Sequence, residues 1–289
     1  MSKFETARAP RAHLFHYDGI DIAACEWGDP DGVPVIATHG WLDNAASFAV
    51  LGPLLKGVRL VAVDLAGHGL SSHRAAHGTY NIWQDVGDIH AVAEQLGWKR
   101  FALLGHSRGG MICTLTAGAF PQRVTHLALL DSFVPQTMTA QEAPQQLAKA
   151  IEKRQKVLAR PSKLYATVAA AEAARTRGES PLTPQAAHLI VGRAIESVAG
   201  GFRWRSDEKL KIPSEVKLTE DMVNAFVTRI ECPVLMLLAH QGRLQRFYGM
   251  EKILTNMTTE IIAGSHHFHM EASAGLVAER LSAFFTKQP

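Results

Sequence analysis

The sequence predicts an α/β fold with a mostly parallel sheet, helices on both faces of the sheet and an inserted helical cap. Short apolar runs bounded by Gly, Pro or Asp indicate buried strands. They lie at residues 33–38, 59–64, 101–104, 127–131 and 233–238. Stretches with helical spacing separate several of these runs, for example residues 85–96 and 110–120. Such alternation of strands and helices is typical of a parallel sheet.

Residues 133–227 interrupt this alternation. They are rich in Ala, Gln, Lys and Arg, contain several Pro residues and show helical spacing without convincing strands. We therefore expect a helical cap inserted between the two parts of an α/β core, residues 1–132 and 228–289. The chain ends in an amphipathic helix over residues 272–285, where Val277, Leu281 and Phe284 share one face.

The composition is that of an ordinary globular protein. Of the 289 residues, 47% are hydrophobic and 20% are charged, and the formal net charge is +3. Because the basic residues are scattered and no run of about 18 apolar residues occurs, we expect neither a nucleic-acid partner nor a membrane partner. Residues 1–13 lack the apolar segment of a signal peptide. The wide spacing of Cys25, Cys113 and Cys232 indicates reduced thiols and a cytoplasmic location, and association into a homo-oligomer stays open.

Residues 105–109 read Gly-His-Ser-Arg-Gly, which matches the G-x-S-x-G nucleophile elbow. A predicted strand runs into this pentapeptide and a helical pattern follows it, which is the context that the motif requires. The positions two before and two after the serine must lack side chains, because strand and helix nearly touch there. Gly105 and Gly109 meet this requirement. We therefore expect Ser107 to be a catalytic nucleophile rather than part of a plain glycine-rich turn.

Two backbone N–H groups are candidates for an oxyanion hole. The N–H of Arg108 directly follows the serine at the start of a helix, where developing negative charge is favoured, and its guanidinium is available to pair with an acid. The N–H of Trp41 follows the predicted strand at 33–38. We interpret His39 as a residue that supports this loop, and residues 64–69 as a tight glycine turn after a strand.

Three histidines compete for the role of general base. In this architecture the order along the chain is serine, acid, histidine, with the histidine between the last strand and the last helix. His266, His267 and His269 all lie in that region. Some of the three are expected to be packing residues. A metal site is disfavoured, because no Asp or Cys stands at ligand spacing beside them and the elbow chemistry requires no metal.

Three sequence stretches carry a closer resemblance. The chain resembles the α/β-hydrolase superfamily and, more closely, the serine hydrolase-like proteins, through residues 39–45 (HGWLDNA), 67–73 (GHGLSSH) and 105–107 (GHS). The superfamily resemblance covers the whole chain apart from the cap. It implies an H-x-x-H-x-E pattern that begins with the catalytic histidine, which falls on His266, His269 and Glu271. The resemblance therefore favours His266 as the base, with His269 second.

The acid of the triad is not in its usual position. That position follows the strand at 233–238, and no carboxylate occurs there before Glu251. Asp131 ends the strand at 127–131, beside the elbow, and some members of the superfamily place their acid there. The alternatives are that Asp131 caps the following turn, or that the enzyme works with a Ser-His dyad.

These residues predict a serine hydrolase that cleaves a small carboxylic ester by a Ser-His-Asp acyl-enzyme mechanism, with no cofactor and no metal. We expect the cap and the aromatic residues Trp41, Phe48, Phe133 and Trp204 to select the substrate. Thioester hydrolysis, C–C bond hydrolysis and cofactor-free perhydrolysis on the same triad are alternatives. A weakly catalytic ligand-binding protein is another, because the usual acid position is empty. Reactions of superfamily members with an Asp nucleophile are disfavoured, because the elbow holds Ser107.

Overall fold

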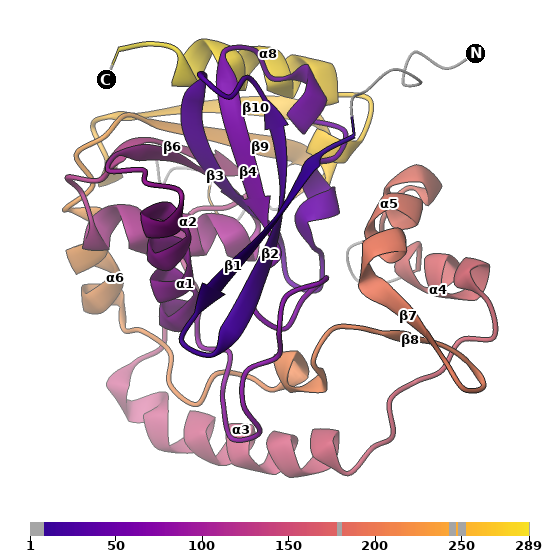
Figure 1. Cartoon of the computed structure of the whole chain (residues 1–289). Helices are drawn as coiled ribbons and strands as arrows, with labels where there is room; N and C mark the ends of the chain where they lie inside the picture. Colours follow the sequence, from indigo (N-terminus) through magenta and orange to yellow (C-terminus); the bar gives the residue numbers. More distant parts are fainter. Residues whose placement is uncertain (1–8, 178–180, 243–246, 248–252, 289) are drawn as a thin grey trace.

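A computed structural model describes residues 9–177, 181–242, 247 and 253–288, and shows an eight-stranded, mostly parallel sheet (Figure 1). The strand order is β1-β2-β4-β3-β5-β6-β9-β10. Only β2 runs antiparallel to its two neighbours, and the other pairs are parallel. The strands are β1 Arg11–Tyr17, β2 Ile20–Gly28, β3 Val33–Thr38, β4 Val58–Val63, β5 Phe101–His106, β6 Val124–Leu130, β9 Val234–Gln241 and β10 Met257–Ser265. The fold class predicted from the sequence is confirmed.

The first two strands form a hairpin that the apolar runs did not reveal. β1 is largely exposed, so its sequence lacks the continuous apolar character of a buried strand. The turn between β1 and β2 is Asp18-Gly19, and both residues have positive φ, 48° and 76°. An Asp-Gly pair is a strong hairpin signal, because this turn type requires positive φ at both positions. That dipeptide was the available clue to the hairpin.

Helices cover both faces of the sheet. On one face, α1 (Ile82–Gln95), α2 (Arg108–Ala119) and α6 (Glu220–Val227) pack into the same apolar cluster as Leu103. On the other face, α8 (Ala274–Phe285) and the short 3-10 helices η1 (Ala45–Phe48) and η2 (Gly52–Leu54) pack around Leu104. Successive residues of β5 thus face opposite layers, which explains why the central strands read as continuous apolar runs.

The segment between β6 and β9 contains more than helices. We call residues 133–219 the insertion, and Figure 1 shows it in pink and orange beside the core. A two-stranded hairpin of β7 and β8 stands among the helices, contrary to the expectation of helical structure alone. Its strands have only four residues each, and Gly200 in the turn and Gly201 at the start of β8 both have positive φ. The elements are η3 Ala140–Glu142, α3 Ala143–Leu158, α4 Val168–Arg175, α5 Pro184–Ala194, β7 Ile195–Val198, β8 Gly201–Trp204 and η4 Glu208–Lys211.

Helix α6 lies within the stretch that the sequence assigned to the cap, yet it packs on the core. Val223 and Val227 join the core cluster, and a Cβ on Gly118 of α2 would lie 2.3 Å from the carbonyl oxygen of Phe226. The glycine therefore permits close contact between the two helices.

Two further findings concern the chain as a whole. Over the described residues, no helix has both the length and the apolar character needed to cross a bilayer. Cys25, Cys113 and Cys232 are buried and their thiols are free.

Candidate active site

Four of the predicted site residues follow the carboxyl ends of parallel strands. Trp41 comes shortly after β3, Ser107 directly after β5, Asp131 directly after β6 and His266 directly after β10. Strands that run parallel end at the same edge of the sheet, which is where ligands bind in open α/β sheets. The topology therefore gathers the candidate residues at one edge.

Ser107 occupies a strained turn between β5 and α2. Its φ of 51° and ψ of −120° are unusual for a residue with a side chain. The turn is fixed on both sides, because the N–H of Ser107 donates to the carbonyl of Leu130 at 3.1 Å and its own carbonyl accepts from the hydroxyl of Ser132 at 2.5 Å. The residue is 8% exposed. Strain held in place by surrounding contacts is common at catalytic positions.

The two glycines of the elbow are required because no side chain fits at either position. A Cβ on Gly105 would lie 2.4 Å from the Cα of Gly110, and a Cβ on Gly109 would lie 2.1 Å from the carbonyl oxygen of Thr38. Both distances are far below van der Waals contact and involve backbone atoms, which cannot move aside easily. The close approach of strand and helix that the motif predicted is present.

Asp131 and His266 lie in direct contact. His266 Nδ1 lies 2.5 Å from Asp131 Oδ2, and the N–H of Ala239 donates to Asp131 Oδ1 at 3.2 Å. Asp131 is fully buried and has a φ of 47°. When Nδ1 carries the proton and donates it to the carboxylate, Nε2 is left unprotonated and can accept a proton. This is the tautomer that a general base needs. The Asp131 carboxylate thus contacts groups from β9 and from the loop after β10. The alternative was that it caps the turn directly after β6, and these contacts are different.

A glycine stands directly after β9, the strand that the usual acid position follows. Gly242 follows β9, and a Cβ there would lie 2.3 Å from Asp131 Oδ2. Gly242 therefore makes room for the carboxylate that arrives from β6. The missing acid is visible in the sequence, but this packing is not. Glu251 lies outside the described residues.

His269 occupies a different environment from His266. It is fully buried, with Nε2 3.4 Å from the hydroxyl of Ser47 and its ring 5.8 Å from that of Phe48. Burial, followed by the charge of His267, lowers the pKa of His269 to about 3. A ring with such a pKa is a poor proton acceptor near neutral pH.

His267 belongs to a second buried network, around Asp43. His267 Nε2 lies 3.2 Å from Asp43 Oδ2, and Nη2 of Arg175 in α4 lies 2.5 Å from Asp43 Oδ1. Burial alone would raise the pKa of Asp43, but the His267 hydrogen bond and the positive charges of His267 and Arg175 hold it well below its usual range. His106 connects this network to His266, because its Nε2 donates to the carbonyl of His266 at 2.9 Å.

Asp43, His106 and His267 form one group of described residues that could offer ligands to a metal ion. Their candidate ligand atoms all lie within 4.8 Å of one another. No Asp was expected beside the histidines, because Asp43 is distant from them in the chain. The contacts favour an ion-pair network over a metal site, since the Asp43 carboxylate already pairs with Arg175 and a dication would lie beside that guanidinium.

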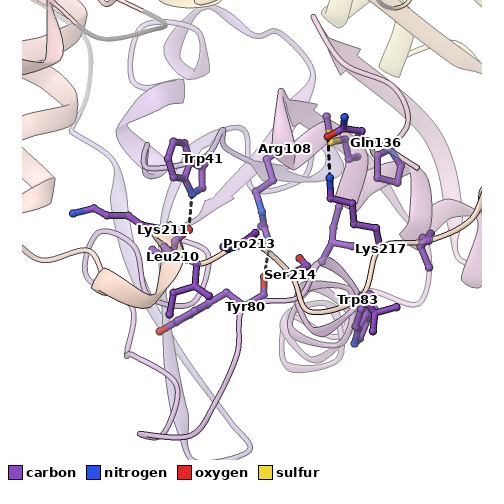
Figure 2. A pocket seen from close by; sticks show the side chains of 16 residues that line it. Trp41, Tyr80, Trp83, Arg108, Gln136, Leu210, Lys211, Pro213, Ser214 and Lys217 are labelled. Carbon is purple, nitrogen blue, oxygen red and sulfur yellow. Dashed lines mark hydrogen bonds between the residues drawn. The ribbon is translucent and has the colours of Figure 1, made fainter. Parts of the chain in front are cut away.

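The two candidate oxyanion donors come from different segments, the amino end of α2 and the loop after β3. Arg108 is the first residue of α2, so its N–H has no partner one turn earlier in the helix. Its guanidinium pairs with Asp85 at 2.7 Å, as the sequence analysis allowed. The indole N–H of Trp41 donates to the carbonyl of Leu210 at 3.0 Å, which fixes the loop after β3 to the insertion (Figure 2).

His39 supports the loop before Trp41, as expected. The N–H of Leu65 donates to His39 Nε2 at 3.0 Å, so the other ring nitrogen, Nδ1, carries the proton and donates to the carbonyl of Gly40 at 2.7 Å. His39 is fully buried, and burial lowers its pKa. Asp64 is also structural, because its carboxylate accepts from the N–H of Leu70 and pairs with Arg193 of α5.

A cavity of about 440 Å³ lies beside Trp41 and Arg108 (Figure 2). Of the four aromatic residues expected to meet the substrate, Trp41 alone is among the residues that line this cavity. Phe48 and Phe133 are fully buried in the core, and Trp204 packs against Tyr165 in the insertion. The sequence analysis missed the other lining residues, which are Tyr80, Ile82, Trp83, Met111, Pro135, Gln136, Leu210, Lys211, Ile212, Pro213, Ser214, Val216, Lys217 and Leu218.

The fold and the site together define the class of this protein, and comparison with known proteins agrees. The chain belongs to the α/β-hydrolase family, whose profile, described as "alpha/beta hydrolase fold", matches residues 33–190. It is similar to a serine hydrolase-like protein of Dictyostelium discoideum, with 30% identity over 288 residues that cover 93% of this chain and 80% of that one. A serine hydrolase-like protein of Danio rerio is 31% identical over 274 residues, covering 88% and 83% of the two chains.

A solved structure is also closely similar. A hypothetical protein from Pseudomonas aeruginosa PAO1 superposes with a TM-score of 0.90 and 42% sequence identity, over 96% of this chain and 99% of that one. The resemblance to the superfamily and to the serine hydrolase-like proteins that the sequence motifs predicted is confirmed.

Proposed function

We propose that this protein is a serine hydrolase that cleaves a small carboxylic ester through a covalent acyl-enzyme. The observation that carries the proposal is the 2.5 Å contact between His266 Nδ1 and Asp131 Oδ2, at the sheet edge where Ser107 stands on its elbow. The contact supports Asp131 as the orienting acid. The empty usual position was the reason for keeping a ligand-binding protein as an alternative.

The reaction follows from the roles of the three side chains. Ser107 Oγ attacks the ester carbonyl carbon while His266 Nε2 takes the hydroxyl proton, and Asp131 stabilises the imidazolium. Collapse of the tetrahedral intermediate breaks the bond to the alkoxy oxygen, which leaves as an alcohol with the proton from His266. Water then attacks the acyl-enzyme, again with His266 as base, and releases the carboxylic acid and free Ser107.

The oxyanion of the intermediate is assigned to the N–H groups of Arg108 and Trp41. Arg108 lies at the amino end of α2, where the helix dipole favours negative charge. Loss of a single oxyanion donor costs roughly 10²–10³ in turnover rate in other hydrolases. Both donors are backbone groups, so substitution of either side chain leaves the donor in place.

A fluorophosphonate probe tests the proposal directly, because only an activated serine reacts with it quickly. We expect rapid stoichiometric labelling of the parent, and no labelling of Ser107→Ala or of heat-denatured parent. Ser107→Ala should retain the circular dichroism spectrum of the parent and lose turnover of p-nitrophenyl esters. A folded parent that neither reacts with the probe nor cleaves any ester would identify a ligand-binding protein instead.

The same triad could act on a thioester, on a C–C bond or, with hydrogen peroxide, on a carboxylic acid. Matched oxygen esters and thioesters with the same acyl group separate the first of these alternatives. We expect the oxygen ester to be hydrolysed with a kcat/KM at least as high as that of the thioester. Preference for the thioester would move the proposed function to that class.

A further inference from the structure

The cavity beside Trp41 and Arg108 has an apolar wall that is open to solvent. Trp41 is 50% exposed, Trp83 of α1 is 42% exposed and Val216 is 53% exposed, and all three line this cavity. Exposed large apolar side chains grouped around one cavity favour an apolar ligand. Arg108, which directly follows the candidate nucleophile in the chain, is one of the residues that line this cavity.

The charge of the lining is one-sided. Of the sixteen residues that line the cavity, Arg108, Lys211 and Lys217 are basic and none is acidic (Figure 2). Arg108 pairs with Asp85 at 2.7 Å, and Lys211 pairs with Glu208 at 2.7 Å. The charges of these two residues are therefore compensated by carboxylates outside the lining.

Lys217 differs from both, and it is half-buried. Its Nζ donates to the amide oxygen of Gln136 at 3.1 Å, which is a neutral partner. Among the described residues, no carboxylate oxygen forms an ion pair with it within 4.0 Å. Glu142 attracts it from further away, but that carboxylate lies on the surface and accepts hydrogen bonds from Thr139. Lys217 also borders a second cavity, which Glu142 and Glu152 line. An ammonium group that borders an apolar cavity and has no carboxylate within 4.0 Å is suited to bind an anion.

Resting on the proposed function, we propose that the substrate is an ester whose apolar acyl chain ends in a carboxylate, and that Lys217 binds this carboxylate. The apolar part of the chain lies against Trp41, Trp83 and Val216. A carboxylate fits better than a phosphate, because a single ammonium balances one negative charge, whereas a phosphate monoester carries nearly two.

Two series of p-nitrophenyl esters of equal chain length test this assignment. One series consists of mono-esters of α,ω-dicarboxylic acids, and the other of esters whose chain ends in a methyl group. At the best chain length we expect kcat/KM of the parent to be about tenfold higher for the acidic ester, mainly through a lower KM. Lys217→Met should reduce this ratio to near one. Lys99→Gln, at the opposite edge of the sheet just before β5, changes net charge equally and should keep the ratio.

Binding provides a readout that does not depend on turnover. Titration calorimetry on Ser107→Ala should show tighter binding of monomethyl adipate than of methyl hexanoate, and the difference should vanish when Lys217→Met is added. Equal affinity for the two compounds, or a preference that survives Lys217→Met, would overturn the assignment. Tighter binding of a chain ending in phosphate would overturn it as well. Absence of ester turnover together with a preserved binding preference would contradict the proposed function and leave the anion site supported.

Discussion

Two buried aspartates at the same edge of the sheet each contact a histidine of the loop after β10, but the two pairs differ. Asp131 contacts His266 through Nδ1 at 2.5 Å, whereas Asp43 contacts His267 through Nε2 at 3.2 Å. Asp43 also pairs with Arg175 of the insertion. The Asp131 contacts described above all come from the core.

The difference shows how adjacent histidines acquire separate roles. Because His266 contacts its carboxylate through Nδ1, its Nε2 is the nitrogen that can accept a proton from the serine of the elbow. In His267 the orientation is reversed, and Nδ1 is buried without a hydrogen-bond partner among the described residues. The charge of Asp43 is compensated by Arg175, so it would stabilise an imidazolium less than an uncompensated carboxylate would. We infer that the first pair is catalytic and that the second joins the insertion to the loop that carries His266.

The largest effect should come from the base. We expect His266→Ala to lower ester turnover by at least about 10⁴-fold, because the members of a triad act as a unit. His269→Gln, a polar replacement of similar size to histidine in the same loop, should leave turnover within a few fold of the parent. Steady-state assays with one activated ester measure both. Equal losses in the two variants would mean that the geometry does not identify the base.

A smaller effect is expected at the link between insertion and core. Arg175→Met leaves the Asp43 carboxylate buried without its cation, and the free energy of unfolding should fall by about 2 kcal/mol. This is less than for a fully buried pair, because the Arg175 side chain is 22% exposed. Arg177→Met, at an exposed position just beyond the same helix, should change stability by less than about 0.5 kcal/mol. Urea unfolding followed by tryptophan fluorescence provides the comparison, and similar shifts in the two variants would contradict it.

The smallest effect is the pH dependence of stability at Asp43. Its pKa in the folded protein is lower than in the unfolded chain, so its contribution is present above the unfolded pKa and is lost as pH falls through the folded pKa. The stability advantage of the parent over Asp43→Asn should therefore be constant between about pH 5 and 7 and decrease below about pH 4. Unfolding curves at several pH values measure it. An advantage that grew on acidification would show that the folded pKa is raised instead.

The central sheet and the elbow could be predicted because local sequence determines them. Strands buried on both faces leave continuous apolar runs, and the elbow needs glycine at two fixed positions around Ser107. Asp131 was predicted as the acid because no carboxylate occurs at the usual acid position after the strand at 233–238. The structure supplied the reason that this position is free, since Gly242 provides the space that the carboxylate of Asp131 occupies.

The cavity and the Asp43 network could not be predicted, because both depend on contacts between distant segments. Arg175 and Asp43 are 132 residues apart, and Lys217 reaches the cavity from the end of the insertion. The aromatic residues Phe48 and Phe133 were expected near the substrate, but they are buried in the core. A single sequence cannot tell an aromatic residue that lines a cavity from one that fills the interior, since both are apolar and only the packing differs.

Substitution of the two aspartates in turn tests the central claim, that Asp131 and not Asp43 orients the catalytic histidine. Asp131→Asn should lower kcat for an activated ester by about 10⁴-fold, because an amide favours the wrong tautomer of His266. Asp43→Asn should lower it by less than about tenfold under conditions where circular dichroism shows both variants to be folded. An Asp131→Asn variant within a few fold of the parent, or an equal loss in Asp43→Asn, would contradict the assignment.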